Sequence, residues 1–336
     1  MLSVVCPVFN EEKYIGKCIE SILHQDYPQS DLEVFFIDGM STDKTSELIS
    51  GYSSKYSFIK LLNNPNRTVP YAMNIGIKAS SGQTIIRLDG HCEYPTNYFS
   101  CLVDSLDKYS ADNVGGVFIT LPCNETNVSY AIAECLKNPF GMGNSLHRIG
   151  AKENIKTDSV PFGCFRREVF DKVGLYDEEL TRNQDDELNA RIIKNGGSIY
   201  IIPSLGIKYY ARDKVSKVRK MFYQYGLFKP LVNKKLGRAA TLRQFAPPMF
   251  VLALVLGVVL TPISKMIFGL YTIFLCSYIL LGVIMGVKSA IKTKRLLLII
   301  LMPWVFLNIH ISYGLGYWIG LSKVLLNRQI SVKSNR

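Results

Sequence analysis

The chain has 336 residues and a formal net charge of +12, but its excess of positive charge lies beyond residue 206. The first 206 residues hold 26 acidic and 19 basic side chains, residues 207–245 hold eleven basic and one acidic, and no acidic residue follows Phe245. Basic residues beside apolar segments favour anionic lipid headgroups as partners. Without a zinc knuckle or RNP motif, nothing in the sequence indicates nucleic-acid binding.

Strand and helix patterns alternate through the first part of the chain. Apolar, β-branched runs predict strands, and helical spacing between them predicts helices. The strands are expected at residues 2–8, 32–37, 59–62 and 84–88, and the helices at 11–24, from a cap at 41–43 to about 52, and at 69–79. Repeated βα units predict a largely parallel sheet with helices on both faces. Because ligands gather at the carboxyl ends of such strands, residues 7–10, 38–43 and 89–91 should converge.

Seven of the eight cysteines are scattered through the first 206 residues without a C-x-x-C pair. This pattern predicts reduced thiols in a domain that faces the cytosol. The opening residues run directly into a predicted strand rather than into a cleavable signal, which agrees with a domain on the side where it is made.

Residues 85–91 read IIRLDGH, an apolar run that ends in two possible metal ligands. An α/β sheet presents a metal-bound diphosphate at the end of such a strand, which makes Asp89 and His91 candidates. A turn with a solvated imidazole is the alternative. Asp38, at the end of another strand, is placed to accept hydrogen bonds from a base or ribose, or to cap the following helix.

Residues 183–192 read NQDDELNARI, with three consecutive acids. The macrodipole favours acids in the first turn of a helix, so a solvated helix start explains the cluster without a function. Glu187 and Arg191 lie four residues apart on one helical face, and their spacing predicts an ion pair.

Four segments together resemble the family 2 glycosyltransferases with the GT-A fold, and in particular the succinoglycan-type exopolysaccharide glycosyltransferases. They read CPVFNEEKYIGKCIESIL, FFIDGMSTDKT, RLDGH and NQDDELNARI. The likeness covers residues 1–237 and, more loosely, the apolar segments that follow. It implies an α/β domain of the GT-A type, a Rossmann-like nucleotide-diphospho-sugar transferase, followed by a C-terminal α-helical membrane region.

The resemblance implies a nucleotide-sugar site at the strand ends. Pro7, Asn10 and Glu11 would line the nucleotide pocket, Asp38 would hold the uracil or ribose, and Gly163 would lie beside the donor sugar.

The resemblance also implies a divalent cation, Mn²⁺ or Mg²⁺. Asp89 and His91 stand at the D-x-D positions. The last member of that motif binds the cation, which makes His91 the expected ligand, and the first member, Asp89, would contact the ribose or the cation. An imidazole in place of the second carboxylate favours Mn²⁺, which accepts nitrogen ligands more readily than Mg²⁺ does.

The resemblance places Asp185 in the position of the catalytic base. Gln184 replaces the first acid of the family's pattern, and Glu187 with Arg191 would orient the acceptor side of the site. Asp186 should point away and serves as an internal control.

These assignments predict an inverting hexosyltransferase. Asp185 would take the proton of an acceptor hydroxyl, and a single base without a second nucleophile implies one displacement with inversion. The expected donor is UDP-linked, and the expected acceptor is polyprenyl-phosphate-linked or a growing polysaccharide. Two alternatives are a catalytically silent nucleotide- or lipid-binding membrane adaptor and a nucleotidyltransferase, which would release pyrophosphate.

Two further segments carry weaker signals. Residues 138–148 read NPFGMGNSLHR, which lacks a phosphate-loop motif and predicts a flexible lid or turn; His147 and Arg148 are candidates for contacts to the diphosphate. Residues 208–233 form a basic collar in which Val215, Val218 and their helical neighbours make an apolar stripe. Such a helix suits a membrane surface, and an ordinary docking helix is the alternative.

Three apolar segments follow, at residues 248–263, 266–287 and 296–321, and about 20 residues are needed to cross a bilayer. Basic residues lie both before the third segment and after it, so the positive-inside rule conflicts with three full crossings. We therefore expect three hydrophobic segments without assigning three crossings. The predicted organisation is a catalytic domain at 1–206, a collar at 207–245, a membrane region at 246–322 and a basic tail at 323–336. A cytoplasmic catalytic domain attached to the cell membrane by a hairpin or several spans is expected.

Overall fold

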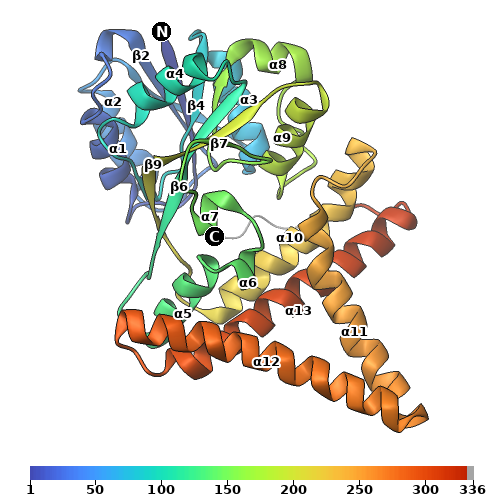
Figure 1. The fold of residues 1–336 in the computed structure, drawn as a ribbon. Helices are drawn as coiled ribbons and strands as arrows, with labels where there is room; N and C mark the ends of the chain where they lie inside the picture. The colour runs from blue at the N-terminus through green and yellow to red at the C-terminus, as the bar shows by residue number, and fades with distance from the viewer. Residues whose placement is uncertain (331–336) are drawn as a thin grey trace. The chain divides into compact units, whose positions relative to one another are not determined.

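The computed structural model describes residues 1–330, which divide into two compact units (Figure 1). The first comprises Met1–Ile119 and Gly150–Tyr209, and the second comprises Thr120–Ile149 and Tyr210–Ile330. Residues 120–149, which the sequence analysis placed in the domain at 1–206, thus belong with the second unit. Of the predicted basic tail, residues 331–336 lie outside the described part of the chain.

The first unit contains one mixed β-sheet. Its parallel part has the order β3-β2-β1-β4, formed by β1 (Leu2–Val8), β2 (Leu32–Asp38), β3 (Ile59–Asn63) and β4 (Thr84–Arg87). The antiparallel part consists of β8 (Cys164–Arg166), β6 (Asn113–Leu121), β9 (Ile199–Tyr210), β5 (Cys92–Glu93) and β7 (Ile155–Lys156). The prediction of a largely parallel sheet holds only for the first four strands. Strands of two or three residues, such as β5, β7 and β8, are too short for periodicity to reveal them.

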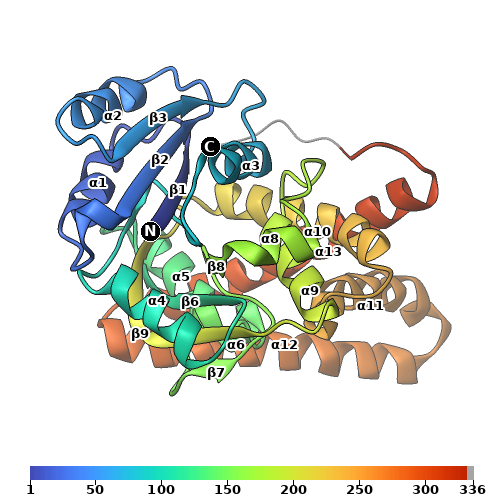
Figure 2. The same cartoon turned by 90° about the horizontal axis from the view of Figure 1, so that it is seen from above.

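Helices cover both faces of the sheet, as predicted. Alternate residues of β1, such as Val4 and Cys6, share a buried core with α1 (Ile15–Leu23), α2 (Thr45–Ser53) and α4 (Tyr98–Lys108). On the other face Gly76 of α3 (Val69–Ala79) packs against Val5. Figure 2 shows α1 and α3 on opposite sides of β1 and β2. This alternation follows from the two-residue period of a strand.

The strand register brings the carboxyl ends of β1, β2 and β4 to one edge of the sheet. Val8 pairs with Asp38, and Val5 pairs with Arg87. Helix α1 begins at Ile15 rather than at the predicted Glu11, because the backbone between them forms a turn that follows the left-handed Asn10. The loop after β1 is therefore longer than the sequence pattern indicated.

The second unit is helical. It contains α5 (Asn127–Leu136), α6 (Pro139–Met142), α7 (Leu146–Ile149), α10 (Val215–Leu236), α11 (Ala246–Leu260), α12 (Lys265–Thr293) and α13 (Leu298–Leu325). Three segments are long and apolar enough to cross a membrane: Leu242–Ile263, Lys265–Thr293 and Leu298–Leu325. The stripe predicted on α10 is buried at Val215, Val218 and Phe222, in one core with α13. The collar thus docks through its apolar stripe. Most basic side chains of α10 stay exposed (Lys217, Arg219, Lys220, Lys234 and Lys235), whereas Lys229 is buried.

Candidate active site

The loop after β1 is tied to the loop after β2 by hydrogen bonds. The amide of Asn10 donates to Ser41 Oγ at 2.9 Å, and Asn10 Oδ1 accepts from the amide of Thr42 at 2.8 Å. The amide of Glu11 donates to Thr45 Oγ1 at 2.7 Å. Residues 10–11 and 41–45, which come from two separate βα units, therefore form one surface next to Pro7.

Asp38 is the last residue of β2, and its buried carboxylate accepts several hydrogen bonds. The amide of Ser41 donates to Oδ2 at 3.0 Å, and the hydroxyl of Ser46 donates to the same oxygen at 2.8 Å. The hydroxyl of Ser41 donates to Oδ1 at 2.5 Å. These bonds fix the orientation of the carboxylate at the sheet edge, beside the surface formed by residues 10–11 and 41–45.

Glu11, Asp89 and His91 form a cluster that can hold a cation, with one ligand atom from each residue within 4.8 Å of the others. His91 Nδ1 lies 3.5 Å from Glu11 Oε1 and contacts Asp89 Oδ1. Burial raises the pKa of Asp89, but the adjacent imidazole of His91 and the guanidinium of Arg87 outweigh it and hold that pKa below its ordinary value. Two carboxylates and an imidazole are a donor set that suits Mn²⁺.

The structure adds Glu11 to the two predicted ligands. The resemblance implied only a place in the nucleotide pocket for Glu11, which the sequence pattern put in the first turn of a helix at residues 11–24. The tie between the loops after β1 and β2 brings Glu11 toward the end of β4. There a β-carbon added at Gly90 would lie 3.4 Å from Glu11 Cγ.

Arg87 is the functional candidate that the sequence analysis missed. It is the last residue of β4, its side chain is only 6% exposed, and its guanidinium forms an ion pair with Asp185. The ring of Phe162 lies 5.5 Å from its Cζ. The available signal was a single charged residue within the apolar run of residues 84–88, two positions before Asp89 and therefore on the same face of the strand.

Asp185 lies in the first turn of α9 (Gln184–Lys194), and 35% of its side chain is exposed. Burial raises its pKa above the ordinary value, while the Arg87 guanidinium opposes this rise. Oδ1 contacts Arg87, and Oδ2 lies 3.5 Å from Gln184 Nε2. One carboxylate oxygen is thus held by an ion pair, and the other has only a long contact with a neighbouring amide.

Asp186 has different surroundings from Asp185. Its Oδ1 accepts a hydrogen bond from Ser159 Oγ at 3.4 Å. The guanidinium of Arg87 pairs with Asp185, whereas the hydroxyl of Ser159 donates to Asp186.

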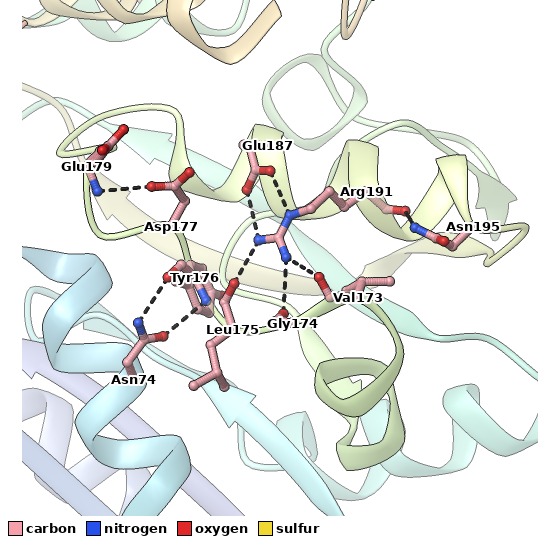
Figure 3. Close-up of polar contacts among 10 residues, drawn as sticks. All are labelled: Asn74, Val173, Gly174, Leu175, Tyr176, Asp177, Glu179, Glu187, Arg191 and Asn195. Atoms are coloured by element: carbon pink, nitrogen blue, oxygen red, sulfur yellow. Dashed lines mark hydrogen bonds and ion pairs between the residues drawn. The ribbon is translucent and has the colours of Figure 1, made fainter. Parts of the chain in front are cut away.

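The ion pair expected between Glu187 and Arg191 is present, with Nε to Oε1 at 2.6 Å and Nη2 to Oε2 at 2.8 Å. Figure 3 shows the same guanidinium donating to the backbone carbonyls of residues 173–175. Asn74 of α3 holds the next residue, Tyr176, through its backbone carbonyl at 2.9 Å and amide at 3.0 Å. Hydrogen bonds from α9 and from α3 thus hold the segment between α8 (Arg167–Val173) and α9 in place.

Gly163 adjoins the same cluster and requires the absence of a side chain. Its φ is +24°, and an added β-carbon would lie 2.6 Å from Asn113 Oδ1 and would collide with the ring of Phe165. Its carbonyl accepts a hydrogen bond from the amide of Arg87 at 3.0 Å. Of the other predicted contacts, His147 and Arg148 lie in α7 of the second unit.

Together, β4 and α9 bring a cation-binding cluster and a half-buried carboxylate to either side of one arginine. The electrostatic influence of Asp89 on Asp185, which raises the pKa of Asp185, agrees with this proximity. A mixed α/β sheet with a cation-binding cluster at its parallel strand ends is the arrangement that the resemblance to the GT-A transferases implied.

The chain belongs to glycosyl transferase family 2, whose profile matches residues 3–174. It is 32% identical over 334 residues to the Methanococcus voltae protein named "Dolichyl N-acetyl-alpha-D-glucosaminyl phosphate 3-beta-D-2,3-diacetamido-2,3-dideoxy-beta-D-glucuronosyltransferase", with 96% of this chain and 97% of that one covered. It is 30% identical over 225 residues to the succinoglycan biosynthesis protein ExoA of Rhizobium meliloti, with 66% and 67% covered. The predicted family is therefore confirmed, and the protein is a glycosyltransferase.

The fold is similar to that of solved transferases. The mannosyltransferase PcManGT from Pyrobaculum calidifontis, solved in complex with GDP-Man and Mn²⁺, has a TM-score of 0.59 and 16% identity. The match covers 91% of this chain and 86% of the other. At this identity the likeness concerns the fold, and it confirms the predicted GT-A class.

Proposed function

We propose that this glycosyltransferase moves a hexose from a nucleotide sugar, UDP-linked, to a polyprenyl-phosphate-linked or growing polysaccharide acceptor. The observation that carries the proposal is the ion pair between Arg87 and Asp185, because it places a carboxylate next to the strand end that bears Asp89 and His91. The activity named for the Methanococcus voltae relative supports a sugar on a dolichyl phosphate as the class of acceptor. The succinoglycan relative supports a polysaccharide product.

The donor side of the proposed site consists of two parts. Pro7, Asn10 and Asp38 bind the nucleoside at the edge formed by the loops after β1 and β2. Glu11, Asp89 and His91 hold a divalent cation, Mn²⁺ or Mg²⁺; when bound, it neutralises the charge that develops on the departing diphosphate.

Asp185 is the proposed general base. Oδ1 is held by Arg87, so Oδ2 remains to receive the proton from the acceptor hydroxyl. Burial raises the pKa of Asp185 and makes it a stronger proton acceptor, while Arg87 keeps the carboxylate ionised near neutral pH. Gly163, Gln184 and the Glu187–Arg191 pair shape the space around it.

One displacement with inversion follows from this arrangement. Retention by a double displacement needs a nucleophile on the opposite side of the sugar carbon, with the two carboxyl groups close together. In the proposed site Asp89 and Glu11 are engaged with the cation, which leaves Asp185 to act as the base.

Membrane attachment forms part of the proposal. The apolar helices of the second unit would anchor the protein in the cell membrane with the catalytic unit on the cytoplasmic side, and the basic residues of α10 would contact anionic lipids. An acceptor with a lipid tail would reach the enzyme at that surface.

The test compares Asp185→Asn with Asp186→Asn in detergent-purified protein. A panel of nucleotide sugars with Mn²⁺ identifies the donor by the nucleoside diphosphate released, and chelation should stop the release. We expect Asp185→Asn to lose about 10²–10⁴-fold in kcat, the usual contribution of a general base, and Asp186→Asn to stay near the unaltered rate. Equal rates in the two variants would contradict the assignment of the base.

The product separates the alternative functions. A nucleotidyltransferase would release pyrophosphate, and a silent adaptor would bind nucleotide or lipid without any turnover that depends on Asp185. Release of a nucleoside diphosphate that stops when the base is removed supports glycosyl transfer over both.

A further inference from the structure

Helix α13 lies beside α10 for most of its length, and the two run in the same direction (Figure 1). A β-carbon added at Gly226 would collide with the carbonyl of Tyr313, and one added at Gly320 would collide with that of Leu227. Further along, Lys234 Nζ lies 3.2 Å from Asn327 Oδ1. Contacts that advance together along both helices mean that α10 and α13 share one orientation.

Helix α10 does not have the composition of a membrane span. Its 22 residues include six basic side chains, spread from its first turn to its last: Lys217, Arg219, Lys220, Lys229, Lys234 and Lys235. Charged side chains at the centre of a bilayer are costly, so a helix with this distribution stays at the surface. Because α13 is packed along α10, it cannot cross the bilayer without carrying these charges with it.

The contacts of α13 with α11 and α12 lead to the same conclusion. The first part of α13 packs on the end of α12, where a β-carbon at Gly286 would lie 2.8 Å from the carbonyl oxygen of Leu298. Its later part packs on the start of α11, where Trp318 Nε1 donates to the carbonyl of Pro248 at 3.0 Å. The first part of α13 therefore contacts the C-terminal end of α12, and its later part contacts the N-terminal end of α11. Both of these ends lie away from the turn between α11 and α12.

The turn between α11 and α12 projects away from α13 (Figure 1). There Gly257 packs on Tyr271, and the apolar side chains around it are largely exposed. A third span that started beside the end of α12 would finish beside this turn. Instead, the later part of α13 lies beside Pro247 and Pro248 at the start of α11.

We propose that only α11 and α12 cross the bilayer, as a hairpin, and that α13 lies with α10 in the headgroup region of the leaflet next to the catalytic unit. This inference rests on the membrane attachment in the proposed function. Burial agrees with this inference. In the most apolar 18 residues of each segment, 44% are buried within the protein for α13, against 11% for the segment containing α11 and 6% for α12.

The partner of this pair of helices is a lipid surface with anionic headgroups. The exposed large apolar side chains of α13 recur at helical spacing along one face: Ile300, Trp304, Leu307, Leu315, Trp318, Ile319 and Leu325. This face would enter the acyl boundary, with the two tryptophans at headgroup level. The exposed Arg219 and Lys220 of α10 supply the positive charge that anionic lipids attract.

The arrangement also removes the conflict in the charge pattern. Lys288, Lys292 and Arg295 precede α13, and Lys323 and Arg328 lie at its end or beyond it. With α13 in the plane of the membrane, both groups lie on the side of the catalytic unit. The positive-inside rule is then satisfied at both ends.

Site-directed labelling of the full chain tests the topology. Single cysteines are placed at the exposed Asn195→Cys in the catalytic unit, at the partly exposed Ser264→Cys between α11 and α12, and at the exposed Gln329→Cys after α13. The exposed Cys123 and Cys276 and the partly exposed Cys101 are changed to alanine. A membrane-impermeant maleimide is applied to intact cells and to opened membranes. We expect Ser264→Cys to react in intact cells, and Asn195→Cys and Gln329→Cys to react only after the membrane is opened.

Two results would overturn the inference. Reaction of Gln329→Cys in intact cells would show that α13 crosses, and failure of Ser264→Cys to react there while it reacts in opened membranes would show that the hairpin does not cross. Protease protection of a C-terminal epitope tag on the otherwise unaltered chain gives a second measurement if a variant fails to fold. Activity of the same preparations is assayed separately, so failure of the topology is distinguishable from failure of the proposed function.

Discussion

Replacement of Arg87 by glutamine should shift the pH dependence of glycosyl transfer. The substitution removes the cation that faces Asp185 and leaves the carboxylate in place. At about 4 Å and an effective dielectric constant of about 20, two unit charges interact by about 4 kcal/mol. Because 35% of the Asp185 side chain is exposed, solvent screening reduces this to about 1–2 kcal/mol, which corresponds to a rise of about one unit in the pKa of Asp185.

The sign of the effect follows from the role of the base. Asp185 accepts a proton only when it is ionised, and Arg87 favours the ionised form. Without the guanidinium, the carboxylate takes up a proton at higher pH, so the acidic limb of the kcat profile should move upward by about one unit. Arg87→Lys keeps a positive charge and should restore part of the shift.

The assay follows release of the nucleoside diphosphate with acceptor at saturation between acidic and weakly basic pH. Cation affinity is measured separately, because Arg87 also lowers the pKa of Asp89. Arg166→Gln serves as the matched control. Arg166 lies on the neighbouring strand β8 and pairs with Asp107 of α4 at 2.8 Å, so its replacement should leave the acidic limb in place. If Arg87→Gln slows transfer without moving the acidic limb, the electrostatic link to Asp185 is refuted.

Three other substitutions test separate parts of the structure. His91→Asp replaces the imidazole of the cation cluster with a third carboxylate, so the ratio of the rate with Mg²⁺ to the rate with Mn²⁺ should rise; an unchanged ratio would count against His91 as a ligand. Gly316→Leu would collide with the carbonyl of Tyr223 and should cost about 1–3 kcal/mol, seen as a lower melting temperature in detergent, whereas Gly269→Leu meets open space and should not lower it. Asn74→Ala removes both bonds to the backbone of Tyr176 and should cost about 1–3 kcal/mol in chemical denaturation; unaltered stability would show that α9 holds the segment alone.

The sequence revealed those parts of the fold that depend on local pattern. Strand β1 and helix α3 have the predicted bounds, because alternation and helical spacing are visible within one segment. The two-residue strand β5 has no pattern of its own and is defined by its antiparallel partner β9 more than a hundred residues later. Residues 120–149 carry ordinary helical spacing, and only their packing shows that they belong with the second unit.

The site residues differ in the same way: some are visible in a local motif, and others depend on partners that are distant in the sequence. Asp38, Asp89 and Asp185 stand out in the sequence because each occupies a distinctive place in a motif. The role of Arg87 depends on a partner 98 residues away, and the place of Glu11 depends on the tie between two loops. Neither relation can be obtained from spacing along the chain.

The charge balance at the end of β4 gives a physical reason for arginine at position 87. Arg87 lies between Asp89 and Asp185 and lowers the pKa of each from the value that burial alone would set. An arginine keeps its charge when buried, whereas a buried lysine is readily deprotonated, and its planar guanidinium presents several donors to flanking acceptors. The cation cluster and the proposed base are therefore both influenced by one side chain, and removal of its charge should raise the pKa of Asp89 and the pKa of the base together.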